Sequence, residues 1–131
     1  MLSRFFKRRP SPLRGAPAVR RQKTYSAQTG FVYQYFYEGY RESKRGGQPG
    51  HEYVFRVSSD RKVSFPFAVF LPRSAVQSWE ESHGRALTAT EQYAAVKMAL
   101  FQAFDDRPEL GAELEISAAA IDSLLATLQI E

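Results

Sequence analysis

Three stretches of sequence decide the fold: GFVYQYFYEGY (30–40), HEYVFRVS (51–58) and KVSFPFAVFL (62–71). In each, side chains alternate with a period of two, as expected for strands with one buried face. The residues that share the apolar parity are Phe31, Tyr33, Tyr35, Tyr37, Tyr53, Phe55, Val57, Val63, Phe65, Phe67, Val69 and Leu71. Three consecutive strands with short connections predict an antiparallel β-meander.

The connections contain residues suited to turns, since 41–50 contains Lys44, Arg45, Gly46, Gly47 and Pro49, and 58–61 is short. In such a meander the first and third strands are the sheet edges. Pro66 makes the third strand a poor partner for a further strand, because proline has no backbone N–H to donate to it. The first strand contains no proline that would prevent another strand from pairing with it. We therefore expect either residues 113–117, as a fourth strand, or a second copy of the chain in a homodimer to cover it.

Helical periodicity begins after the third strand. Residues 74–77 have the spacing of a capping box, and Gly84 offers a stop, which predicts a short helix. A second capping box at Thr88 and Glu91 opens a longer helix that ends by Asp106, because a proline follows closely. The apolar stripe of these helices comprises Trp79, Tyr93, Val96, Leu100, Phe101 and Phe104. We expect it to pack on the aromatic face of the meander.

The last segment alternates Leu114 and Ile116 with glutamates, which suits a short strand. Ser117 could then cap a final helix, whose apolar residues are Ile121, Leu124, Leu125 and Leu128. The expected fold class is therefore α+β, a three- or four-stranded antiparallel β-meander packed against C-terminal helices.

The N-terminal 24 residues differ from the rest in charge. They hold eight bases and no acid, and the bases are Arg4, Lys7, Arg8, Arg9, Arg14, Arg20, Arg21 and Lys23. Because the whole chain has 18 bases and 14 acids, residues 25–131 hold ten bases and 14 acids, a net charge of −4. Three prolines and few aliphatic residues predict a disordered arm over 1–24, preceding a single domain over 25–131.

Several roles for this arm stay open. It could bind a polyanion such as RNA or a ribonucleoprotein surface through all eight bases. It could instead be a cleaved presequence of a mitochondrial matrix protein, leaving a protein-interaction domain. Contact with a membrane surface through Leu2, Phe5 and Phe6, or a solubilising tail, are further readings. No stretch of the sequence is apolar enough to predict a membrane span.

The sequence contains no recognisable catalytic, metal or cofactor motif. His51 and His83 lack partners at ligand spacing, and cysteine is absent. The adjacent acids of 80–81 and 105–106 diverge on a helix, so they do not converge on one substrate. The tyrosines of 33–37 could stack bases, but their parity favours the core. We expect a non-catalytic cytoplasmic binding or assembly protein, with an uncharacterised enzyme as the last alternative.

One resemblance to a known family is confined to two short segments. Pro49, Gly50 and His51, with Phe55 and Val57 after them, resemble the second strand of double-stranded-RNA-binding domains, and residues 94–100 are similar to their final helix. That family has a helix before its first strand and a lysine-rich start to its last helix, and this chain has neither. Its function is therefore not transferred to this chain.

Overall fold

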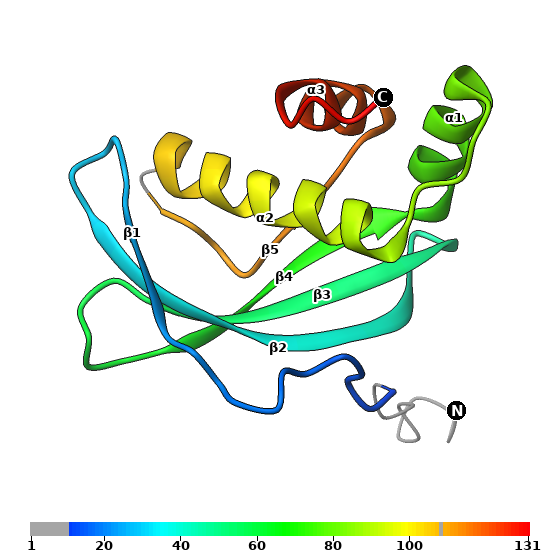
Figure 1. Cartoon of the computed structure of the whole chain (residues 1–131). Helices are drawn as coiled ribbons and strands as arrows, with labels where there is room; N and C mark the ends of the chain where they lie inside the picture. The colour runs from blue at the N-terminus through cyan, green and yellow to red at the C-terminus, as the bar shows by residue number, and fades with distance from the viewer. Residues whose placement is uncertain (1–10, 108) are drawn as a thin grey trace.

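The computed structural model describes residues 11–107 and 109–131, which form an α+β structure. Its strands and helices are β1 (Lys23–Ser26), β2 (Val32–Arg45), β3 (Gln48–Ser58), β4 (Phe65–Pro72), α1 (Arg73–His83), α2 (Ala89–Asp106), β5 (Glu113–Glu115) and α3 (Ala118–Thr127). The sheet order is β1-β2-β3-β4-β5, antiparallel except that β5 runs parallel to β4. Figure 1 shows the sheet curling beneath α2. The predicted meander is present as β2–β4, with one more strand on each side.

The turn between β2 and β3 is much shorter than predicted. Gly46–Gly47 forms a two-residue hairpin with φ of 55° and 79°, the positive values that this type of turn requires. The loop expected over 41–50 is wrong, because these residues lie on β2 and β3 apart from the Gly46–Gly47 turn, and Arg41 and Arg45 have their side chains on the outer face of the sheet. There Glu52 accepts hydrogen bonds from Arg41 at 2.8 Å and from Arg45 at 2.9 Å.

A β-bulge changes the side-chain parity within β2. The register shifts between Tyr37 and Gly39, and Glu38 is the extra residue. As a result Tyr40 pairs with Tyr53 and lies on the same face as Tyr37. Strict alternation of side chains along the sequence predicts that Tyr40 lies on the opposite face.

The edges of the sheet are covered differently from the expectation. β1 pairs with β2 from Lys23 to Ser26, so the chain's own N-terminal segment covers the outer edge of β2. Residues 113–115 pair with the opposite edge, along β4 from Ala68 to Phe70. The prediction for 113–117 was right about a strand and wrong about its place. The edge argument for a homodimer no longer applies, because β1 occupies that position.

The helix boundaries follow their caps. The Thr88 hydroxyl accepts from the third backbone amide of α2 in a complete capping box, and Ser117 caps α3, both as predicted. Gly84 ends α1 with a φ of 68°. The capping box expected at 74–77 is wrong, since α1 begins directly after Pro72 and has no side-chain cap.

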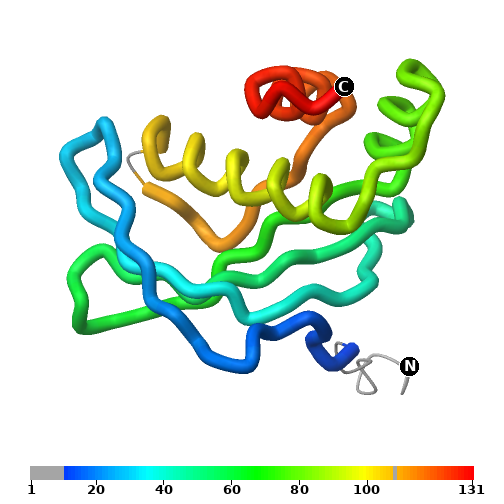
Figure 2. Tube along the Cα trace, viewed as in Figure 1, coloured from blue at the N-terminus to red at the C-terminus, as the bar shows by residue number. Residues whose placement is uncertain are grey.

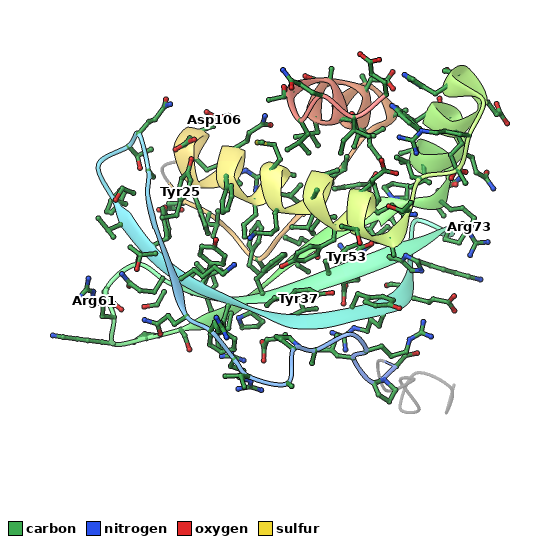
Figure 3. All side chains as sticks on the ribbon, in the orientation of Figure 1. Tyr25, Tyr37, Tyr53, Arg61, Arg73 and Asp106 are labelled. Atoms are coloured by element: carbon green, nitrogen blue, oxygen red, sulfur yellow. The ribbon has the colours of Figure 1, made fainter. Side chains whose placement is uncertain are left out.

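The core lies between the helix-facing side of the sheet and the three helices, and the packing of Trp79 and the apolar stripe of α2 on this face was predicted. Its largest fully buried side chains include Trp79, Phe55, Phe67, Phe104, Leu100, Ile121 and Leu125. Figure 3 shows side chains filling the layer between α2 and the strands. Phe36, on the outer face, is only half-buried.

Candidate functional site

The N-terminal segment is attached to β2 at two separate points. Arg14 and Tyr40 exchange two backbone hydrogen bonds of 2.8 Å, and Lys23 pairs with Tyr35 where β1 begins. Between these points residues 15–22 lie opposite only residues 36–39, eight against four. The segment therefore bows away from the strand, as the blue tube in Figure 2 shows.

This bow encloses one side of a pocket of about 580 Å³. The sheet side of the pocket comes from β2 and β3, and the opposite side from the first half of α2. The bowed segment contributes alternate residues, which are Gly15, Pro17, Val19, Arg21 and Lys23. Five tyrosines line the pocket: Tyr35, Tyr37, Tyr40, Tyr53 and Tyr93. Figure 3 labels Tyr37 and Tyr53 below α2. We call this site the tyrosine pocket.

The charged lining of the tyrosine pocket is entirely basic. It consists of Arg21, Lys23 and Lys97, and none of the described carboxylates lines the pocket. Burial, and then the neighbouring Lys23, lower the pKa of Lys97. The Lys97 ammonium also lies 6.0 Å from the ring centroids of both Tyr35 and Tyr93. Partly desolvated like charges without an acid favour an anionic ligand.

The start of α2 adds to this positive field. Ala89 and Thr90, the first two residues of the helix, line the pocket. The N-terminus of a helix carries partial positive charge and attracts anions. Arg85 holds the nearby Glu91 carboxylate at 2.9 Å, and this hydrogen bond is the main reason that the pKa of Glu91 falls to about 2. The one acid at this helix end is therefore already paired.

The tyrosines and the histidine of the pocket are uncharged at neutral pH. Burial raises the pKa of Tyr53 and of Tyr93 to about 12 and raises that of Tyr37 as well, so these phenols stay protonated at neutral pH. Burial lowers the pKa of His51, which keeps its imidazole neutral. The pocket thus offers aromatic faces, hydroxyl groups and cations.

The predicted arm residues divide into three groups. Arg4, Lys7, Arg8 and Arg9 lie outside the described residues. Arg21 and Lys23 line the tyrosine pocket. Arg14 and Arg20 lie at its rim, where their guanidinium carbons stand 5.2 Å from the rings of Tyr40 and Phe36. For residues 11–24 the structure differs from a free arm, because both attachment points hold this segment against β2.

The sequence interpretation missed the contribution of α2. Lys97 is the only base in this helix, and it stands four residues from both Tyr93 and Phe101 in the apolar stripe. A lone lysine at the centre of a buried stripe is a signal that a charge is required there. The tyrosines expected in the core do belong to it, since Tyr33 and Tyr35 are buried and Tyr37 packs against them, but Tyr35 and Tyr37 also line the pocket.

No protein-family model, curated protein or solved structure matches this chain. Within residues 11–107 and 109–131, no group of three or more His, Cys, Asp or Glu side chains could hold a metal ion. No helix in that part of the chain is long and apolar enough to cross a bilayer. Function must therefore be inferred from the tyrosine pocket itself.

Proposed function

We propose that the protein is a non-catalytic binding protein for single-stranded RNA. A base stacks in the tyrosine pocket, and the adjoining phosphates lie along the basic N-terminal segment. The observation that carries the proposal is the composition of the pocket, in which five tyrosines and three bases meet without a carboxylate.

This composition matches the physical requirements of single-strand binding. Proteins that bind such strands combine a positive groove for the backbone with aromatic rings for the bases, and each stacked base contributes roughly 1–3 kcal/mol. A pocket of about 580 Å³ is large enough for a nucleoside. Arg21 and Lys23 face the pocket from the segment, and Lys97 faces it from α2.

The proposal keeps the N-terminal segment in the working protein. Cleavage of a presequence ending at residue 24 would remove Lys23 and Thr24 from β1, and with them one wall of the pocket. For the same reason, deleting residues 1–24 is a poor test, because it would damage the sheet edge. Single substitutions separate RNA contact from folding.

The test is fluorescence anisotropy of a labelled ten-nucleotide RNA with variants of the full chain. Tyr40→Leu retains apolar bulk but removes the aromatic face, so we expect affinity to fall about tenfold, while Tyr40→Phe stays within about twofold. Arg21→Gln should weaken binding and reduce the salt slope by about 0.7.

Lys44→Gln is the matched control for charge, since Lys44 is exposed on the β2–β3 hairpin and does not line the pocket. It should bind RNA like the wild type. Equal losses in Arg21→Gln and Lys44→Gln would show diffuse electrostatic attraction and contradict a site at the pocket. Absence of RNA binding in the wild type would reject the function.

A further inference from the structure

A second groove, of about 480 Å³, lies on the outer face of the sheet where β1, β2 and β3 run side by side. Gln34 lines it, and its register partners on the neighbouring strands are Thr24 and Ser58. Arg61 and Lys62, from the turn between β3 and β4, form the rim. Figure 3 labels Arg61 at this end of the molecule. We call this site the Gln34 groove.

Gln34 is an unusual residue for this position. It is only 5% exposed, and neither its amide nitrogen nor its amide oxygen has a hydrogen-bond partner among the described residues. The neighbouring Ser58 hydroxyl already has its own partners, because it donates to Asp60 and accepts from the Arg61 amide. Buried amides without partners destabilise a fold, and an apolar side chain of the same shape avoids this cost. The carboxamide therefore has a use other than stability.

The chemistry of a carboxamide indicates the ligand. Its oxygen accepts and its nitrogen donates, side by side, which is the arrangement that pairs in two hydrogen bonds with N7 and the N6 amino group of adenine. The Gln34 groove also has an aromatic ring, Phe36, and two cations, Arg61 and Lys62, at its rim. These groups suit a purine base with its phosphate.

The Gln34 groove and the tyrosine pocket share one lining residue. Phe36 lines both sites. The Arg20 guanidinium lies 5.2 Å from the Phe36 ring and 3.9 Å from the Glu38 carboxylate, and its side chain is 69% exposed. An RNA strand that places one base in each site therefore passes Arg20 with the phosphate between them.

We propose that the Gln34 groove is a second base site and that it selects adenine next to the base held in the tyrosine pocket. The inference rests on the proposed RNA-binding function. Residues 59–64 are exposed throughout and residues 61–64 line the Gln34 groove, so this turn can move without uncovering the core. Binding lifts this turn and gives the orphaned amide its two partners.

The test compares the RNAs (AU)5, (GU)5 and U10 by anisotropy at one salt concentration. Wild-type protein should bind (AU)5 about tenfold more tightly than U10, and (GU)5 should bind like U10. Gln34→Leu should lower the affinity for (AU)5 to that for U10 and leave U10 unchanged. Gln28→Leu, the same substitution at an exposed residue of the β1–β2 turn, should keep the preference.

Thermal unfolding supplies a second readout. Because Gln34 makes no hydrogen bond that the substitution would remove, Gln34→Leu should melt at the same temperature as wild type or higher. A lower melting temperature would mean that the amide has a structural partner, and would overturn the proposal. Equal binding of (AU)5 and U10 by wild type would overturn the adenine site alone. Binding of none of the three RNAs would overturn the RNA-binding function as well.

Discussion

Aromatic side chains lie at both ends of the helix-facing side of the sheet, but they are packed differently at the two ends. At the end near the C-terminus of α2, Phe104 stacks on Tyr33 with centroids 4.2 Å apart, and Phe101 stacks on Tyr25 at 4.6 Å. At the other end, tyrosines on the same face of the same strand line an open pocket. We call these the closed end and the open end.

The difference comes from what lies opposite the strands. At the closed end α2 presents phenylalanines, and β1 pairs continuously with β2. At the open end α2 presents Tyr93 and Lys97 beside the small residues Ala89 and Thr90, and the N-terminal segment bows away. One row of tyrosines can therefore serve as core or as binding surface, depending on the volume and charge of the residues that face it.

The largest loss of stability should come from removing an aromatic ring at the closed end. Phe104→Ala should lower the free energy of unfolding by about 3–5 kcal/mol, because the ring is fully buried and its removal leaves a cavity. Tyr40→Ala, at the open end, should cost less than half as much. Urea titration followed by Trp79 fluorescence measures both. Similar losses would mean that the open end is as tightly packed as the closed one.

A smaller effect should follow from detaching the N-terminal segment. At Gly39 an added Cβ would lie 2.6 Å from the Arg14 carbonyl oxygen, and the residue has a φ of 130°. Gly39→Ala should cost about 1–3 kcal/mol and also weaken RNA binding. Gly30→Ala is the matched control, since Gly30 has a φ of 94° but nothing within 4 Å of the added Cβ. If both variants bind RNA equally, the attachment at Arg14 does not shape the pocket.

One tyrosine hydroxyl at each end should contribute differently to stability at pH 7 and at high pH. In the folded protein the pKa of Tyr53 is about 12, compared with 10.0 as its ordinary value, so between pH 10 and 12 the unfolded chain loses a proton that the folded chain keeps. Stability therefore falls as the pH rises through this range. Tyr53→Phe should reduce that fall and leave stability at pH 7 nearly unchanged, because this hydroxyl makes no hydrogen bond within the described residues.

Tyr25, at the closed end, provides the contrast. Its pKa also rises to about 12, but chiefly because its hydroxyl donates to Asp105 at 2.7 Å. Tyr25→Phe should therefore already lower stability at pH 7. Urea titrations at pH 7 and pH 11.5 distinguish the two tyrosines. A loss at pH 7 in Tyr53→Phe would contradict the open-end assignment.

The smallest change in stability should come from Lys97→Met. This substitution removes a partly desolvated charge that faces Lys23, so stability should change by less than about 1 kcal/mol or rise slightly. RNA affinity should nevertheless fall, with the salt slope reduced by about 0.7. Unchanged affinity would show that the lysine only packs against the rings around it.

Sequence patterns predicted the elements more successfully than their contacts. The parity of residues 51–58 and the capping box at Thr88 are local signals, and both were confirmed. The bulge at Glu38 was not visible, because its extra residue is recognised only from the pairing with β3. The tyrosine pocket was missed for the same reason, since it depends on the two distant attachment points of the N-terminal segment.

The parallel strand β5 has a consequence for how the chain is synthesised. Its pairing joins Ala68 to Glu113, so β4 leaves the ribosome about 45 residues before its partner, a delay of roughly 2–9 s at ordinary translation rates. Throughout this interval the outer edge of β4 offers unpaired amides and carbonyls to other nascent chains. A message that ends before codon 113 would make that exposure permanent, and aggregation of the truncated product is the expected cellular outcome.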